Sequence, residues 1–299
     1  MGGNGLIDKV TLRWSENIDT DDGVAPVFAD IPTITLPDGT ATSSEGASVT
    51  DPAGLSTDVV VTLISGQVTV NTAAGSTAIS GDLSAKWKDG ANNVPHATGG
   101  TGNEAVTDSA KPVFKTSTTA DTNTNGTVDQ ITIVYSETVS VADGSAADGL
   151  PGVAFANSCV AANADYASTT GTYTIVTVTG CTASDTSITA SPTYTAATGG
   201  IIDIAAGLNE MADTETVTGT DGSAPTILSS TGSDSDADGK TNTYVITLSE
   251  NVTDRGAAAV NANFTARNAV STNAITVSTV GIGATAGGAA NKATLNLDD

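Results

Sequence analysis

The chain has 299 residues, enough for two or three domains, and only 14% of them are charged. The charge is one-sided, with 33 acidic against 10 basic side chains and a formal net charge of −23. This balance excludes a nucleic-acid surface, because phosphate binding needs clustered lysine and arginine, and it disfavours anionic membranes.

The acidic excess has two interpretations. It is either a solubility feature of a protein in a salty medium, or a sign that bound divalent cations neutralise many carboxylates. The acidic residues fall partly in ligand-spaced runs and partly elsewhere, so composition leaves both open. Aromatic residues make up 4% of the chain, too few for an enzyme with a deep apolar pocket.

In chain order, the first predicted strand covers residues 6–16 and contains Trp14 on its apolar side. Short β-branched segments follow, separated by Asp, Gly, Pro and Ser, which is the pattern of short strands joined by turns. These segments are residues 32–36, 57–64, 67–71 and 76–80.

The most informative stretch is an acidic loop that runs directly into a strand. Oxygen-bearing side chains occupy every second position, and Gly126 supplies a tight turn. This pattern predicts a calcium loop, with a metal-free Asp/Asn-Gly turn as the alternative. The expected ligands are the side chains of Asp121, Asn123, Asn125 and Asp129 and the main-chain carbonyl of Thr127.

The strand after this loop has a period of two, with Ile131, Ile133 and Tyr135 on one face. The closing glutamate of an EF-hand would fall at Thr132, inside the strand, so the site is not an EF-hand. Glu137 lies about 27 Å from Asp129 along an extended strand and cannot close the same site. It either joins Asp143 or a junctional cation, or serves as a strand-end hydrogen-bonding residue.

The loop and strand recur. The loop glycines are Gly5, Gly126 and Gly239, and the Ser-Glu pairs begin at Ser15, Ser136 and Ser249. In both series the first step is 121 residues and the second is 113 residues. We call the second step, from Gly126 to Gly239, the repeat offset. The recurrence predicts a second calcium loop and the remnant of another. The ligands expected there are Asp234, Asp236, Asp238, Lys240 (main chain) and Asn242, together with Asn4 and Asp8.

Further strands are expected at 172–179, 187–195, 274–280 and 292–296, and no convincing helix is found, the alanine-rich stretch 256–267 included. Cys159 and Cys181 flank a predicted hairpin. We expect a disulfide between neighbouring strands, with two free thiols as the alternative.

Catalysis finds little support in the residues. His96 is the only histidine, and no serine or cysteine triad is evident around it. A carboxylate pair for glycoside cleavage would need an aromatic-lined groove, and aromatic residues are scarce. We therefore expect no enzyme. The sequence contains no apolar run long enough to span a bilayer and no signal peptide.

The unit-start prolines Pro112 and Pro225, the D-x-D-x-[DN]-G-x-x-D loop and the strand ending in Ser-Glu resemble the bacterial Ig-like repeats of large secreted surface proteins. That resemblance implies an all-β chain of tandem Ig-like β-sandwich domains, at residues 1–109, 110–222 and 223–299, with the terminal ones incomplete. The sequence departs from the family pattern at residues 1–3, where the first acidic ligands are missing, and at Asn242, where Asp is typical.

The resemblance also implies a function. We expect a calcium-binding structural segment of an extracellular, cell-surface, S-layer or filament-forming protein, stiffened by Ca²⁺. Its partners would be neighbouring repeats of a longer array or other subunits that donate missing strands. The alternative is a calcium-dependent adhesin that binds glycans or a host surface.

Overall fold

The computed structural model describes residues 9–20, 33–35, 48–50, 56–62, 78–80, 87–89, 91, 108–141, 150–165, 170–196, 200–204, 208–253, 266–267, 274–275, 277–282 and 291–297. In these ranges the chain consists of β-strands, turns and loops without an α-helix, which confirms the all-β prediction. A helix capable of crossing a membrane is accordingly not found in this part of the chain. Asn4, Asp8, His96, Asp143 and the segment 67–71 lie outside it.

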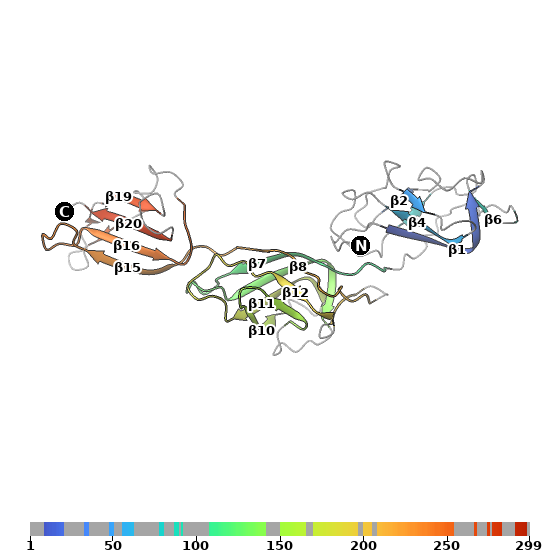
Figure 1. The fold of residues 1–299 in the computed structure, drawn as a ribbon, viewed down its shortest axis with the longest axis horizontal. Coiled ribbons are helices and arrows are strands. Elements are labelled where there is room, and N and C mark those ends of the chain that lie inside the picture. Colours follow the sequence, from blue (N-terminus) through green and yellow to red (C-terminus); the bar gives the residue numbers. More distant parts are fainter. Residues whose placement is uncertain are drawn as a thin grey trace.

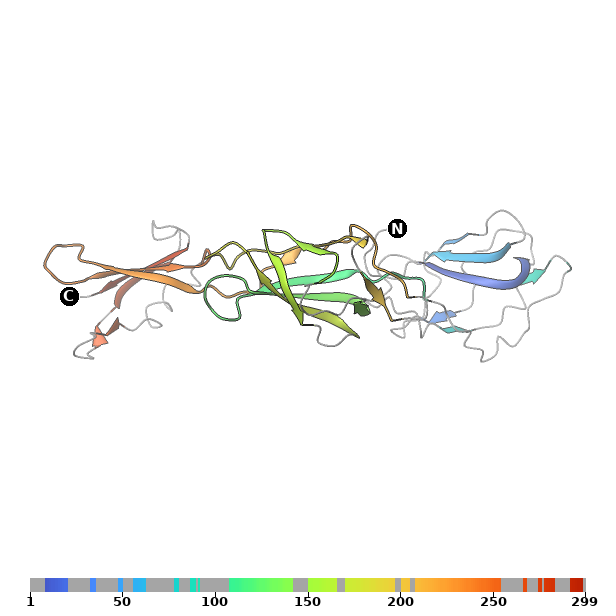
Figure 2. The ribbon, with the colours of Figure 1, turned by 90° about the horizontal axis from the view of Figure 1, so that it is seen from below.

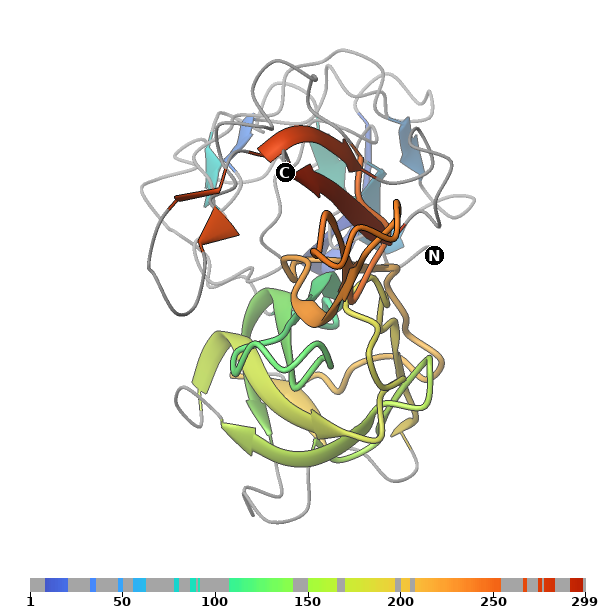
Figure 3. The ribbon, with the colours of Figure 1, turned by 90° about the vertical axis from the view of Figure 1, so that its left-hand side faces the viewer.

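The strands form three successive groups, which Figures 1 and 2 show following one another along the long axis. In Figures 1 and 3 the second group is displaced to one side of the other two. Each group combines one larger sheet with a two-stranded sheet.

The first group contains the strand order β3-β4-β1-β6 and the pair β2-β5. Its strands are β1 (Lys9–Thr20), β2 (Thr33–Thr35), β3 (Ser48–Thr50), β4 (Ser56–Thr62), β5 (Ala78–Ser80) and β6 (Trp87–Asp89).

The second group has the order β10-β11-β8-β7-β14, with β13 also on β8, and the pair β12-β9. Its strands are β7 (Phe114–Ala120), β8 (Gln130–Val141), β9 (Val153–Phe155), β10 (Val160–Asp165), β11 (Thr170–Thr179), β12 (Pro192–Tyr194), β13 (Ile201–Asp203) and β14 (Gly219–Thr220).

The third group has the order β15-β16-β20-β19 and the pair β17-β18. Its strands are β15 (Ile227–Ser233), β16 (Thr243–Leu248), β17 (Ala266–Arg267), β18 (Ala274–Ile275), β19 (Val277–Ile282) and β20 (Lys292–Leu297).

The sequence repeat is also a repeat of strand register. Phe114 pairs with Tyr135 and Ile227 with Leu248, and the pairs that follow in β7–β8 and β15–β16 keep the repeat offset. The same irregularity falls after the first pair in both ladders. A copied hydrophobic pattern keeps the register, because a slip of one residue would turn every side chain to the other face.

The best-formed core lies in the second group. Alternate residues of β8 point into it, and Ile131 and Ile133 are fully buried. Tyr135 is buried as predicted, and its hydroxyl lies 3.0 Å from the hydroxyl of Thr174. The fully buried Tyr194 donates its hydroxyl to Glu210 and accepts a hydrogen bond from the Ile201 amide, so its polar end is satisfied.

Most predicted strands are present. The segments expected at 32–36, 57–64, 76–80, 172–179, 274–280 and 292–296 coincide with β2, β4, β5, β11, β18 with β19, and β20. The segment 187–195 differs, because only Pro192–Tyr194 forms a strand. The carbonyls of Ile188 and Ala190 accept hydrogen bonds from the side chains of Thr119 and Ser117, so side chains replace a ladder there.

The disulfide expected across the hairpin is present. Cys159 and Cys181 form a disulfide, and they stand just before β10 and just after β11, which pair antiparallel. Both are buried in the core cluster of the second group. The bond therefore fastens the open end of this hairpin.

Candidate cation sites

The β7–β8 loop turns its oxygen-bearing side chains inward. Asp121 accepts hydrogen bonds from the amides of Asn125 (3.2 Å) and Gly126 (2.7 Å). Asn125 accepts one from the Thr127 amide (2.8 Å), and Asp129 accepts two from Thr122, each of 2.9 Å. Each carboxylate oxygen has two lone pairs, so these contacts leave acceptor capacity for a cation.

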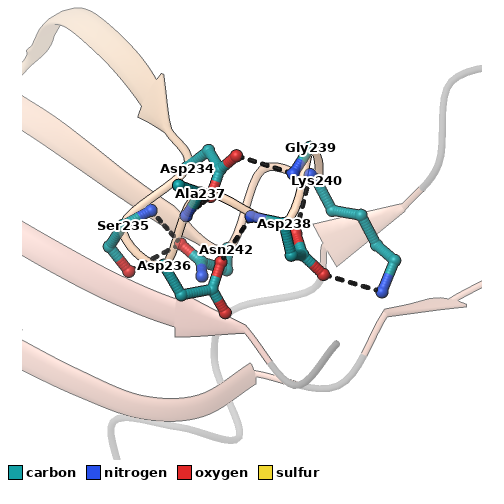
Figure 4. A network of polar contacts seen from close by, with 8 residues as sticks. All are labelled: Asp234, Ser235, Asp236, Ala237, Asp238, Gly239, Lys240 and Asn242. Carbon is teal, nitrogen blue, oxygen red and sulfur yellow. Dashed lines mark hydrogen bonds and ion pairs between the residues drawn. The ribbon is translucent and has the colours of Figure 1, made fainter.

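The β15–β16 loop repeats this arrangement (Figure 4). Asp234 accepts hydrogen bonds from the amides of Ala237 (2.6 Å) and Gly239 (2.8 Å), and Asp238 accepts one from the Lys240 amide (2.8 Å). Asn242 stands where Asp129 stands in the earlier loop, and its Oδ1 accepts both the amide and the hydroxyl of Ser235. The departure from Asp therefore keeps the hydrogen bonds that close the loop.

Backbone conformation explains the shared shape. Gly126 and Gly239 have φ angles of 83° and 90°, a region that glycine adopts without strain. Thr124 and Ala237, each two positions before the glycine, also share positive φ angles of 57° and 62°. The two copies of the loop thus follow one backbone path.

The predicted ligands of the later loop include a compact acidic cluster. Carboxylate oxygens of Asp234, Asp236 and Asp238 all lie within 4.8 Å of one another, and the three residues are exposed. Calcium binds oxygens at about 2.3–2.6 Å, so oxygens on one ion are at most about 5 Å apart, and the cluster fits this limit. Hydrogen bonding, chiefly from the Gly239 amide, lowers the pKa of Asp234, so this carboxylate is readily ionised.

The side chain of Lys240, whose main-chain carbonyl is a predicted ligand, contacts Asp238. Its ammonium group lies 3.0 Å from Asp238 Oδ2, and this hydrogen-bonded contact lowers the pKa of Asp238. Both side chains are solvent-exposed, and an exposed ion pair contributes little to stability. A cation at Asp238 would compete with this ammonium group for the same oxygen.

A second acidic cluster is buried. Oxygens of Asp108, Glu137 and Asp203 lie within 4.8 Å of one another, and the three residues are 4%, 3% and 0% exposed. Asp203 accepts the amide (2.9 Å) and the side-chain Nδ2 (2.7 Å) of Asn209. Ionised carboxylates this close repel one another, and a bound cation would offset that repulsion.

The fold assembles this triad from distant segments. The strand pair β8–β13 places Val139 opposite Asp203, two positions from Glu137, and Asn209 Nδ2 also donates to the Asp108 carbonyl (3.1 Å). The sequence pattern singles out Glu137 but does not join it to Asp108 or Asp203. One signal was available, because Asp108 and Asp221 are separated by the same repeat offset as Glu137 and Glu250.

The serine of each Ser-Glu pair has a structural task. Ser136 Oγ accepts the Val113 amide at 3.0 Å, and the Ser136 amide donates to the Val113 carbonyl. Ser249 makes the same exchange with Thr226, at 2.9 Å for each bond. The pair therefore fixes the segment that enters the first strand of its group.

The β7–β8 loop also contacts the third group. Thr226 Oγ1 donates to Asp121 Oδ2 at 3.3 Å, and Leu228 packs against Gly126. Beside this loop, in the segment after β11, Thr186 Oγ1 lies 2.6 Å from Ser249 Oγ. Gly239 in the equivalent loop has open space where a Cβ would stand. A predicted cation ligand, Asp121, is thus also part of a contact between two strand groups.

Matched glycine substitutions separate loop shape from this contact. Gly126→Ala and Gly239→Ala should each cost about 1–2 kcal/mol, because alanine is strained at their positive φ. Gly126→Ala should cost about 0.5–1 kcal/mol more, since its Cβ also meets Leu228. That excess should vanish when Gly126→Ala is combined with Leu228→Ala, relative to Leu228→Ala alone. Denaturant unfolding of the four variants checks this, and equal costs in both loops would contradict it.

The contact between these groups includes a carboxyl-carboxyl pair. Glu250 is buried, and burial raises its pKa, followed by the charge of Asp221 and a hydrogen bond with it. The charge of Asp185 adds to this, whereas a hydrogen bond from Thr186 opposes it. The folded protein therefore favours the protonated form of Glu250 more than the unfolded chain does.

This pKa has a defined effect on stability. The contribution of Glu250 is fully present below its ordinary pKa of 4.5 and is lost as pH rises through the higher folded value. We expect Glu250→Gln to flatten the pH dependence of the unfolding midpoint above pH 4.5. Carboxyl NMR titration checks the cause: in Asp221→Asn the Glu250 pKa should fall, and an unchanged value would rule the pairing out.

No family model, no curated protein and no solved structure matches the chain.

Proposed function

We propose that this chain is a structural, calcium-binding repeat segment of an extracellular surface or filament-forming protein. In this proposal the three strand groups are tandem Ig-like β-sandwich repeats. Bound calcium stiffens them, and neighbouring repeats or other subunits are their partners. The chain itself carries out no chemistry.

The observation that carries the proposal is the repeated loop. Its two copies share alternate Asp and Asn side chains, one backbone path and the same inward hydrogen bonds. A turn needed only to reverse the chain has no requirement for the three closely spaced aspartates of the later copy, which repel one another. Asp234, Asp236 and Asp238 also meet the distance limit for one calcium ion.

Three further observations support it. The buried Asp108–Glu137–Asp203 triad offers three more carboxylates at ligand spacing. Asp121 belongs both to a loop of the second group and to its contact with the third, so an ion there would stiffen that contact. The disulfide is typical of secreted proteins, which fold in an oxidising compartment.

Thermal unfolding in calcium and in EDTA tests the proposal. Calcium bound only to the folded chain should stabilise it by about 3 kcal/mol at a hundredfold excess over its dissociation constant, so the midpoint should rise. Magnesium should substitute poorly, since it demands a smaller octahedral site.

Variants assign the effect to its site. Asp234→Asn together with Asp236→Asn should remove part of the calcium-dependent rise, whereas Asp213→Asn, at an exposed carboxylate outside both clusters, should leave it intact. A wild-type midpoint that is the same in calcium and in EDTA would end the metal hypothesis.

A further inference from the structure

The third group exposes a sheet face whose equivalent is buried in the second. We call it the acceptor face, and its members are Ile227, Ser230, Gly232, Tyr244, Ile246 and Leu248. They follow their equivalents in the second group by one repeat offset; those equivalents are, in the same order, Phe114, Ser117, Thr119, Ile131, Ile133 and Tyr135. Ile227 is 62% exposed, against 4% for Phe114, and Tyr244 is 38% exposed, against 0% for Ile131. With identical register, Ile227 and Tyr244 are therefore exposed here, while Ile246 and Leu248 are half-buried.

In the second group, residues 181–222 supply the cover. Ser117 and Thr119 donate their hydroxyls to the carbonyls of Ala190 (2.7 Å) and Ile188 (3.1 Å). Ile188, Ala190, Tyr194, Ile201 and Met211 complete the apolar cluster with Phe114 and β8. The cover thus meets both the apolar and the hydroxyl side chains of the face.

The same segment closes the outer edge of β7. β14 pairs with it in parallel, with Gly219 opposite Ser117 and Thr220 opposite Thr118. Thr220 Oγ1 donates to the Ser117 carbonyl at 2.9 Å. Gly222 lies so close to Thr118 and to the Thr119 carbonyl that a Cβ would stand 2.7 Å from that oxygen.

In the third group, β15 is the end strand of its sheet, and among the described residues only β16 pairs with it. Its residues Ser229–Ser233 are exposed. An existing contact adjoins the acceptor face, because Thr226 and Leu228, the chain neighbours of Ile227, contact Asp121 and Gly126. An added segment would extend an interface that the chain already forms.

We propose that the acceptor face binds a segment with the chemistry of residues 181–222, supplied by a further copy of this repeat, with a strand parallel to β15. Main-chain hydrogen bonds to the β15 edge would provide affinity, and burial of Ile227 and Tyr244 would add to it. A glycine at the position of Gly222 would provide specificity, because only glycine clears the strand backbone. The inference extends the proposed function, since it names the acceptor of a donated strand.

The test uses the full chain and a synthetic polypeptide of residues 181–222 with Cys181→Ser. We expect saturable binding by calorimetry, with slowed amide exchange at Ser229–Ser233. Ile227→Lys in the full chain should weaken binding at least about tenfold. The matched control is Val160→Lys on β10, at 60% exposure, which should leave the affinity within about twofold.

The polypeptide has its own control. Gly222→Leu should lose at least about tenfold in affinity, because the side chain would collide with the backbone at Gly232, the equivalent of Thr119. Absence of saturable binding overturns the inference. Binding that survives Ile227→Lys overturns it too, since the polypeptide would then occupy the second group. The calorimetry is carried out both in EDTA and in calcium. Failure of the polypeptide to bind in either medium is therefore distinguishable from failure of the calcium proposal.

Discussion

Glu137→Gln is expected to stabilise the protein in EDTA and to destabilise it in calcium. In EDTA the substitution removes one of three buried carboxylates within 4.8 Å of one another, which should relieve about 1–3 kcal/mol of repulsion at neutral pH. In calcium it removes a charged ligand. The stabilisation lost should reach about 4 kcal/mol when calcium exceeds its dissociation constant a thousandfold.

The change of sign is what identifies a cation site. Glu215→Gln is the matched control, because Glu215 is a half-buried carboxylate of the same strand group outside the triad. Burial raises the pKa of Glu215. Because Glu215 lies outside the triad, Glu215→Gln should change the stability by the same amount in EDTA and in calcium. Unfolding midpoints of the three proteins in EDTA and calcium give the answer. A loss of stability in both media for Glu137→Gln would show a purely structural hydrogen-bonding role.

Removal of the Cys159–Cys181 disulfide is expected to destabilise the second strand group by about 3 kcal/mol, since the bond closes a loop with a sequence separation of 22. The physical reason is the larger conformational freedom of the unfolded chain without the cross-link. Both sulfurs also belong to the buried core cluster, so polar replacements would add a further cost.

Cys159→Ala with Cys181→Ala is therefore the cleaner variant, and the wild type with and without reductant provides the comparison. Denaturant unfolding should show both losses to be similar in size. A midpoint that does not change on reduction, with alkylation confirming free thiols, would refute the expectation.

The sequence predicted the local features of the two Asp/Asn loops well. Alternate oxygen-bearing side chains and a glycine define the turn, and its hydrogen bonds join residues only two to seven positions apart. The same holds for the strands, because a period of two with one apolar face is a local property. The sequence pattern did not indicate the contact between the Lys240 side chain and Asp238.

The buried triad was not predictable in the same way. Its three carboxylates come from the segment before β7, from β8 and from β13, and each of these stretches looks ordinary alone. Only the pairing of β13 with β8, and the hydrogen bonds of Asn209 to Asp203 and Asp108, bring them together. A repeated Ser-Glu pair indicated that Glu137 matters, without naming its neighbours.

By itself the sequence determined the all-β class, the repeat and its strand register, since alternation, turn residues and copied spacing act over a few residues. The tertiary structure decided what each copy touches. Phe114 and Ile227 hold the same position in the same ladder, yet one is 4% and the other 62% exposed. A Cβ at Gly126 would meet Leu228, and one at Gly239 would meet nothing within 4 Å. Burial and contact depend on which distant segments lie over a strand, and no local pattern contains that information.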